Sequence, residues 1–157
     1  TLIENHLKNE DYASVGITAV TPLGLFRIMK PYLARIDNIH CIEEYLYSKE
    51  MSVAGQVDCV AEYKGKLTVI DFKSSTKRRD ADYNYGNFLQ TAAYAKMFEE
   101  IYPGKKIEQT LVLASCEDGF VQEWLHSESD IKKHQELFYK HATDFFNLHK
   151  DSLAKIS

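Results

Sequence analysis

Two aspartates, Asp58 and Asp71, occupy mirrored positions around the dipeptide Lys64-Gly65. The β-rich runs on either side predict an antiparallel hairpin, because glycine accepts the positive φ of a two-residue turn. Residues equally distant from such a turn pair directly, so the two carboxylates are expected to face each other with Cβ atoms about 4.5–5.5 Å apart. Like charges at that separation destabilise the strand pair unless something offsets them.

A shared proton, a nearby lysine or a divalent cation can offset two apposed carboxylates. Lys73 is expected on the same strand face, two residues beyond Asp71, where the hairpin register pairs it with Gln56. Hard oxygen ligands suit Mg²⁺ or Mn²⁺, which complete their shell with water and substrate phosphate. The pattern therefore favours phosphate chemistry, in which the metal lowers the pKa of a water and Lys73 orients it, deprotonates it or neutralises the phosphate.

Two other interpretations of the aspartates stay open at this point. Asp58 could be a solvent-facing strand residue and Asp71 an ordinary salt-bridge partner of Lys73. A retaining glycosidase would also hold two carboxylates about 5 Å apart, but it has no need of the adjacent lysine. Apolar neighbours favour the buried, functional interpretation, because unpaired charge on a buried strand is unfavourable. These neighbours are Val57, Val60, Val69, Ile70 and Phe72.

Hydrophobic periodicity and turn signals predict the elements that position these residues. Thr21 followed by proline predicts a helix start, and the helical spacing continues to about Ile36 with a kink or early stop at Pro31. Two more helices are expected, over residues 87–102 and from Ser129 onward. The expected strands span residues 39–47, 53–63, 66–74, 107–114 and 119–125. This order predicts an α/β fold with a mixed central β-sheet flanked by helices.

Length and composition limit the functional classes. The chain has 157 residues, 45% of them hydrophobic, and a formal net charge of −4. These values predict one domain over residues 1–157 and give no global sign of nucleic-acid binding. Cys41, Cys59 and Cys116 are widely spaced, which argues against a disulfide framework and against a zinc or iron–sulfur site and predicts buried thiols. No apolar run approaches the roughly 20 residues that span a bilayer, so we expect no membrane partner.

Three motifs, in this order, resemble the RecB-like branch of the PD-(D/E)XK nuclease superfamily. They are Gly55-Gln56-Val57-Asp58 for G-x-x-D, Ile70-Asp71-Phe72-Lys73-Ser74-Ser75 for D-x-K, and Gln90-Thr91-Ala92-Ala93-Tyr94 for Q-x-x-x-Y. Within that branch the run DCVAEYKGKLTVIDFKSS is most similar to the mitochondrial genome maintenance exonucleases and to related viral or bacterial single-strand DNA exonucleases. The resemblance implies a restriction-endonuclease-like core and Mg²⁺- or Mn²⁺-dependent hydrolysis of DNA, with a preference for single-stranded ends.

The resemblance also implies roles for individual residues. Asp58, Asp71 and the main-chain carbonyl of Phe72 would bind the metal, and Lys73 would assist the attacking water. Glu43 resembles a glutamate that relatives carry on the preceding strand, and it would line the metal site. A solvated strand residue is the equal alternative for Glu43.

Two further parts of the family pattern concern helices. Gln90 and Tyr94, one helical turn apart on one face, would contact the DNA or orient the catalytic groups; the alternative is a polar edge on a core helix. The family commonly has G-x-x-x-H-x-x-x-E in its first helix. If Glu4 is that glutamate, the histidine falls immediately before Thr1, so some native N-terminal residues are expected to be missing, and His6 is a weaker substitute. A non-catalytic nucleic-acid-binding module that retains the nuclease fold therefore stays open.

A basic and aromatic segment follows the D-x-K motif. Basic groups attract the phosphate backbone and aromatic faces stack on unpaired bases, so we expect single-stranded DNA here rather than a solvated loop. The expected contacts are Ser74, Ser75, Lys77, Arg78, Arg79, Tyr83 and Tyr85. A structure-specific endonuclease is a third possibility, which the Q-x-x-x-Y motif disfavours. The resemblance implies an intracellular protein, cytoplasmic in a bacterial or viral setting, with the mitochondrial matrix as the alternative.

Overall fold

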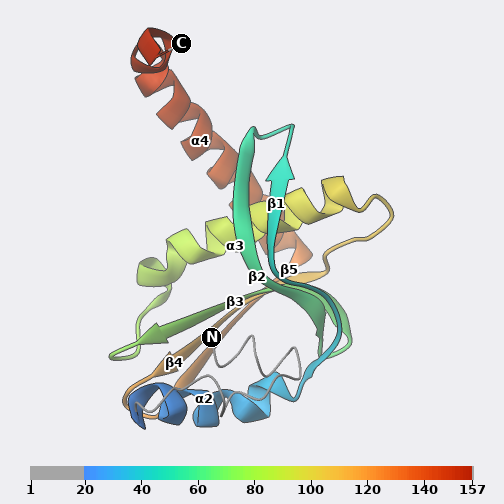
Figure 1. Cartoon of the computed structure of the whole chain (residues 1–157), viewed down its shortest axis with the longest axis vertical. Helices are drawn as coiled ribbons and strands as arrows, with labels where there is room; N and C mark the ends of the chain where they lie inside the picture. Colours follow the sequence, from blue (N-terminus) through green and yellow to red (C-terminus); the bar gives the residue numbers. More distant parts are fainter. Residues whose placement is uncertain (1–19, 157) are drawn as a thin grey trace.

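The computed structural model describes residues 20–156, and it describes the side chains of residues 27–142. Helices lie on both sides of one β-sheet (Figure 1). The elements are α2 (Val20–Leu33), β1 (Ile36–Ser48), β2 (Val53–Tyr63), β3 (Lys66–Ser75), α3 (Ala81–Ile101), β4 (Gln109–Cys116), β5 (Val121–Ser127) and α4 (Glu128–Ile156). None of the helices in this described part is long and apolar enough to cross a membrane.

The sheet contains five strands in the order β1-β2-β3-β4-β5. Neighbouring strands are antiparallel except for β3 and β4, which are parallel and connected by α3. A parallel pair needs such a crossover, because its second strand must begin at the same end of the sheet as the first. The predicted α/β fold, a mixed central sheet flanked by helices, is confirmed.

The β2–β3 hairpin has the predicted two-residue turn. Lys64 and Gly65 both have positive φ, 53° and 80°, as a type I′ turn requires. The ladder has the predicted register from the pair beside the turn as far as Cys59 and Ile70. It ends there, one pair before the two aspartates.

Beyond this point β2 and β3 follow different partners, as Figure 1 shows. β2 continues along β1, where Gln56 pairs with Tyr45. β3 continues along β4, where Lys73 pairs with Ala114. The predicted pairing of Lys73 with Gln56 is therefore wrong, because the two strands separate before they reach it.

The boundaries of two helices differ from prediction. α2 ends at Leu33 with Pro31 inside its last turn, as an early stop. α3 begins at Ala81, six residues before the predicted start, because the Asp80 side chain caps it by accepting a hydrogen bond from the Tyr83 main-chain N–H at 2.8 Å.

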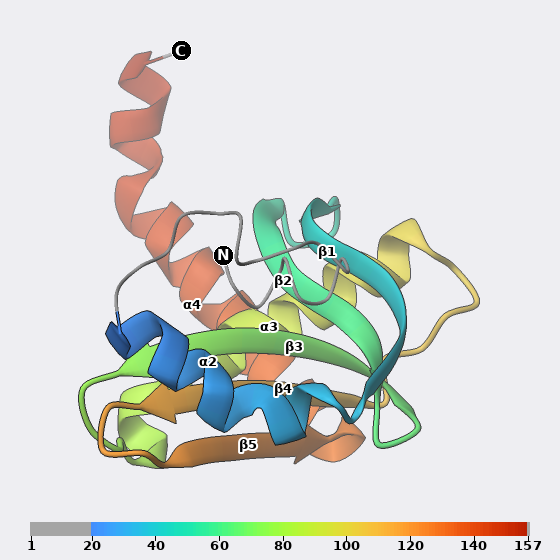
Figure 2. The same cartoon turned by 60° about the horizontal axis from the view of Figure 1, so that its bottom comes forward.

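Each face of the sheet has its own core, and we name the faces after the helices that cover them. On the α3 face, α3 packs against buried residues that include Val60 and Val69. On the α2 face, α2 contributes Met29 and Leu33 to a cluster with Ile70 and residues of β4. Figure 2 shows α2 lying across β3 and β4. Val69 and Ile70 point to opposite faces, so Asp71 returns to the α3 face. The three cysteines are buried, as predicted.

Candidate active site

The two aspartates meet where β2 and β3 separate. The Phe72 main-chain N–H donates a hydrogen bond to Asp58 Oδ2 at 2.9 Å, which holds the Asp58 carboxylate against β3. Lys73 Nζ lies 3.3 Å from Asp71 Oδ2. The Asp71 residue is 6% exposed, whereas the Lys73 side chain is 40% exposed. The structure thus brings together Asp58, Asp71 and Lys73, with the lysine on the solvent side.

The Asp71 carboxylate has too few partners for its burial. Burial raises the pKa of Asp71 to about 7, together with the hydrogen bond and the charge of Asp58, while Lys73 acts in the opposite direction. Its Oδ2 atom is buried and accepts no hydrogen bond from the described residues, although Lys73 forms an ion pair with it. A buried carboxylate oxygen without a donor, next to a second carboxylate, is the environment that a cation relieves.

The oxygen atoms at this position fit a divalent cation of the Mg²⁺ or Mn²⁺ type. Such ions accept one or two carboxylates and fill the rest of their shell with water and phosphate oxygens. Asp58 and Asp71 would hold the ion, and the main-chain carbonyl of Phe72 stays a predicted third ligand. Among the residues that the structure describes, no three or more His, Cys, Asp or Glu side chains gather into a metal-binding group. A cation here would therefore rely on water and substrate for most of its shell.

Glu43 lies beside this site, on the strand that pairs with β2. It lies in β1 between the pairs that Ile42 and Glu44 form with β2, at the level of Asp58. Its φ of 51° breaks the regular strand, and the residue is exposed. Its main-chain carbonyl accepts a hydrogen bond from Gln56 Nε2 at 3.0 Å. Its role as a metal ligand stays a prediction.

The Q-x-x-x-Y residues of α3 form a pair over the aspartates. Gln90 Nε2 donates a hydrogen bond to the Tyr94 hydroxyl at 2.9 Å. Burial raises the pKa of Tyr94, and the negative charges of Asp71 and Asp58 raise it further, which places the phenol close to the carboxylates. Gln90 is exposed, whereas Tyr94 is buried.

Gly55 explains why the G-x-x-D and Q-x-x-x-Y motifs belong together. A Cβ atom on Gly55 would lie 2.9 Å from Tyr94 Cε1 and 3.1 Å from its hydroxyl oxygen. The absence of a side chain at Gly55 therefore makes room for the ring that stands over the aspartates. The sequence marks the glycine, but nothing in it reveals this contact with α3.

The predicted DNA-binding residues divide into two groups. Ser75 and Arg79 interact, because Arg79 Nε donates to Ser75 Oγ at 3.4 Å, and the Arg79 guanidinium lies 4.4 Å above the Tyr83 ring. Ser74, Lys77 and Arg78 are exposed nearby. Tyr85 instead packs edge-on against His134 of α4, with ring centroids 5.8 Å apart. Tyr85 therefore lies on another side of α3 from Tyr83.

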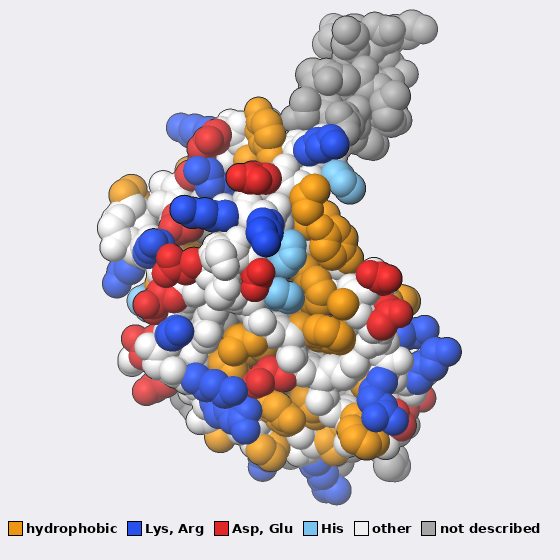
Figure 3. All heavy atoms as spheres, turned by 180° about the vertical axis from the view of Figure 1, so that it is seen from behind, with side chains coloured by type: hydrophobic (Ala, Val, Ile, Leu, Met, Phe, Trp, Pro, Cys, Tyr) orange, Lys and Arg blue, Asp and Glu red, His pale blue; other side chains and the backbone are white. Residues whose placement is uncertain are grey.

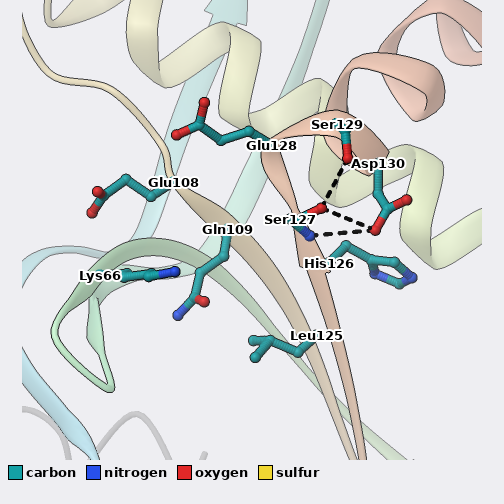
Figure 4. A pocket seen from close by; sticks show the side chains of 9 residues that line it. All are labelled: Lys66, Glu108, Gln109, Leu125, His126, Ser127, Glu128, Ser129 and Asp130. Carbon is teal, nitrogen blue, oxygen red and sulfur yellow. Dashed lines mark hydrogen bonds between the residues drawn. The ribbon is translucent and has the colours of Figure 1, made fainter.

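A cavity of about 560 Å³ lies at the other end of the sheet. It is lined by Lys66, where β3 begins, and by the region where β5 leads into α4 (Figure 4). Its polar groups bond to one another, since the Ser127 main-chain N–H and hydroxyl both donate to Asp130 Oδ2. It holds none of the predicted site residues, and Asp71 lies further along β3.

The family model described as the PD-(D/E)XK nuclease superfamily matches residues 5–151. The chain belongs to this superfamily. It is 31% identical over 98 residues to mitochondrial genome maintenance exonuclease 1 of Mus musculus and 29% identical over 98 residues to that of Homo sapiens. These matches cover 61% of this chain and 29% and 28% of the relatives, so the chain spans less than a third of their length.

A solved structure supports the fold independently. The crystal structure of a candidate exonuclease from Eubacterium rectale superposes with a TM-score of 0.61 at 9% sequence identity. The match covers 83% of this chain and 53% of the other. The fold and the superfamily predicted from the three motifs are confirmed. The first-helix positions predicted at Glu4 and His6 lie outside the described residues.

Proposed function

We propose that this chain is a DNA exonuclease domain that hydrolyses phosphodiester bonds with Mg²⁺ or Mn²⁺ and prefers single-stranded ends. The observation that carries the proposal is the buried Asp71 oxygen that lacks a donor beside Asp58 and Lys73. Membership of a nuclease superfamily and the exonuclease names of the relatives support the same activity. The exposed Tyr83 ring, on which Arg79 stacks, supports a single-stranded substrate, because aromatic faces stack on unpaired bases.

The chain's own residues have separable roles in this proposal. Asp58 and Asp71 hold the cation, which when bound would polarise the phosphate and make a water nucleophilic. Lys73 is exposed enough to reach that water or a phosphate oxygen, and its ion pair with Asp71 keeps it at the site. Gln90 fixes the Tyr94 hydroxyl, and this pair would position the DNA or the carboxylates.

The test is degradation of end-labelled DNA in Mg²⁺ or Mn²⁺ against EDTA, with linear single-stranded, circular single-stranded and duplex substrates. The unchanged chain should degrade linear single strands in the presence of metal, and Asp71→Ala should not. Glu136→Ala, which removes an exposed acidic residue of α4, is the matched control and should cut normally. Efficient cleavage of circles would replace the exonuclease proposal with an endonuclease.

A non-catalytic DNA-binding module is the second candidate, and one observation favours it. Only two carboxylates gather at the site among the described residues. Thermal stability with and without metal distinguishes the nuclease from the binding module. A metal that binds the folded state at 100 times its dissociation constant stabilises the protein by about 2.7 kcal/mol. We expect Mn²⁺ to raise the melting temperature of the unchanged chain and not that of Asp71→Ala. DNA binding without cleavage and without this metal effect would support the binding module.

A further inference from the structure

The turn between β4 and β5 holds an exposed aromatic ring beside the basic segment. Phe120 is 51% exposed, and the Arg78 guanidinium lies 3.9 Å from its ring centroid. The next residue, Arg79, makes the corresponding stack on Tyr83 at 4.4 Å. Two adjacent arginine–aromatic stacks therefore stand on this part of the surface. No motif in the sequence marks Phe120.

This turn is a direct continuation of the strand that carries Asp71. β3 and β4 remain paired as far as Ser75 and Cys116, and the Glu117 main-chain N–H donates to the Ser75 carbonyl at 3.0 Å. A strand rises about 3.3 Å per residue, so the end of β3 lies about 13 Å from Asp71. A nucleic-acid strand with a phosphate at Asp71 would cross this distance within a few nucleotides.

The segment that carries Arg78 and Arg79 is attached to the face of the sheet that holds the aspartates. Val121 of β5 packs against the α2-face core, so the next residue, Gln122, lies on the α3 face. Gln122 bonds to the main chain of Arg79 through both its side-chain oxygen and its side-chain nitrogen. Arg79 N–H donates to Gln122 Oε1 at 2.9 Å, and Gln122 Nε2 donates to the Arg79 carbonyl at 2.7 Å. Arg79 leads into α3, which covers that face. Basic and hydrophobic side chains are seen together at the end of the molecule where β3 and β4 end (Figure 3).

The segment between β3 and α3 is held in place, unlike an ordinary solvated loop. The Ser75 hydroxyl donates to the Lys77 carbonyl at 2.7 Å, and the Asp80 cap fixes the following helix. Asp118 accepts a hydrogen bond from Arg78 Nε at 3.2 Å, which orients the guanidinium over Phe120. A preorganised surface loses little conformational entropy on binding.

We propose that Phe120, with Arg78 on its ring, is a stacking platform for an unpaired base a few nucleotides from the scissile phosphate. The proposal rests on the proposed nuclease function, which it extends by assigning a strand path along β3 toward the β4–β5 turn. Base stacking on the ring gives binding energy without sequence preference. Bases in a duplex are already paired and stacked, so the platform selects single strands.

The experiment measures binding of a labelled single-stranded oligonucleotide by fluorescence anisotropy in EDTA, where no cleavage occurs. Phe120→Ala should weaken binding by about 10-fold, within the range that aromatic-to-alanine changes produce at stacking sites. Tyr139→Ala is the matched control, because Tyr139 is a ring of α4 with the same 51% exposure. It should bind normally. Phe120→Trp keeps a stacking surface and should retain the affinity, which excludes misfolding as the cause of a loss.

Abasic sites identify the nucleotide that stacks. One abasic position, a few nucleotides from the end, should weaken binding to the unchanged chain as much as Phe120→Ala does, with no further loss when the two are combined. Equal affinities of Phe120→Ala and the unchanged chain would overturn the platform, and metal-dependent cleavage by that variant would show that the nuclease function stands. Absence of both binding and cleavage in the unchanged chain would overturn both proposals.

Discussion

Two acidic residues on opposite faces of one sheet have contrasting surroundings. On the α2 face, Glu123 accepts a hydrogen bond from the Tyr63 hydroxyl and lies 3.3 Å from both Arg35 Nη1 and Lys64 Nζ. Burial raises the pKa of Glu123, but these three donors outweigh it and the pKa lies below its usual value. On the α3 face, Asp71 has one lysine and a second carboxylate, and its pKa rises to about 7.

The contrast separates a carboxylate that stabilises the fold from one that is available for binding. Glu123 connects β5 to β2 and to the segment after α2, so its charge is satisfied by the protein itself. Asp71 is more deeply buried and keeps an oxygen without a donor. Residues kept short of partners reduce stability and are retained where function needs them. The missing partner of Asp71 is the one that a divalent cation would supply.

Replacing each carboxylate by its amide tests this comparison most strongly. Asp71→Asn should reduce DNA cleavage by about 10³-fold or more, since a charge that holds the cation is lost. It should also stabilise the metal-free protein by about 1 kcal/mol, because the unfavourable burial of the Asp71 charge beside Asp58 outweighs its ion pair with Lys73. Cleavage rates and urea unfolding in EDTA measure the two effects.

Glu123→Gln is the matched control for this change. It should destabilise the fold by about 1–3 kcal/mol, since Arg35, Lys64 and Tyr63 lose a charged acceptor. Cleavage by the folded fraction should stay near normal. Normal cleavage by Asp71→Asn, or a comparable loss of cleavage in folded Glu123→Gln, would remove the distinction between the two carboxylates.

The two lysines beside these carboxylates give the next largest contrast. Lys73 and Lys64 are similarly exposed, at 40% and 45%, and each lies 3.3 Å from its carboxylate. Lys73→Met should lower the cleavage rate by about 10²- to 10⁴-fold, as expected for loss of a group that moves a proton or neutralises developing charge. Stabilisation by Mn²⁺ should survive, because both aspartates remain.

Lys64→Met removes the same charge from the α2 face and should leave cleavage unchanged. A loss of Mn²⁺ stabilisation in Lys73→Met would show that the lysine acts on metal binding and not on the reaction. The two variants therefore separate a role in chemistry from a role in holding the site together.

Local parts of the fold and site could be predicted from the sequence. The Lys64-Gly65 turn and the register beside it follow from the positive φ that such turns require, and the structure has both. The three motifs could also be recognised from the sequence, because each lies within a single strand or helix. Together they identified the superfamily. Asp58, Asp71 and Lys73 come together, although the two aspartates do not form the predicted pair in the ladder.

Features that depend on distant partners could not be predicted in this way. The separation of β2 from β3 is determined by the pairing of β2 with β1 and of β3 with β4, which no hairpin signal contains. The Arg78–Phe120 contact joins a loop to a turn in another hairpin. The early start of α3 is different in kind, because its cap at Asp80 is local and its signal is present in the sequence.

The contact of Gly55 with Tyr94 gives the smallest of these effects and tests how the site is positioned. Gly55→Ala places a Cβ 2.9 Å from the Tyr94 ring, so the ring must shift and cleavage should fall about 10-fold, as small misplacements do. Gly86→Ala is the control, because a Cβ on this glycine of α3 has nothing within 4 Å. It should leave cleavage unchanged and stabilise the helix by about 1 kcal/mol. If Gly55 acts through Tyr94, then Gly55→Ala should cause no further loss in a Tyr94→Ala background. If the losses in cleavage rate are additive, Gly55 affects the site independently of Tyr94.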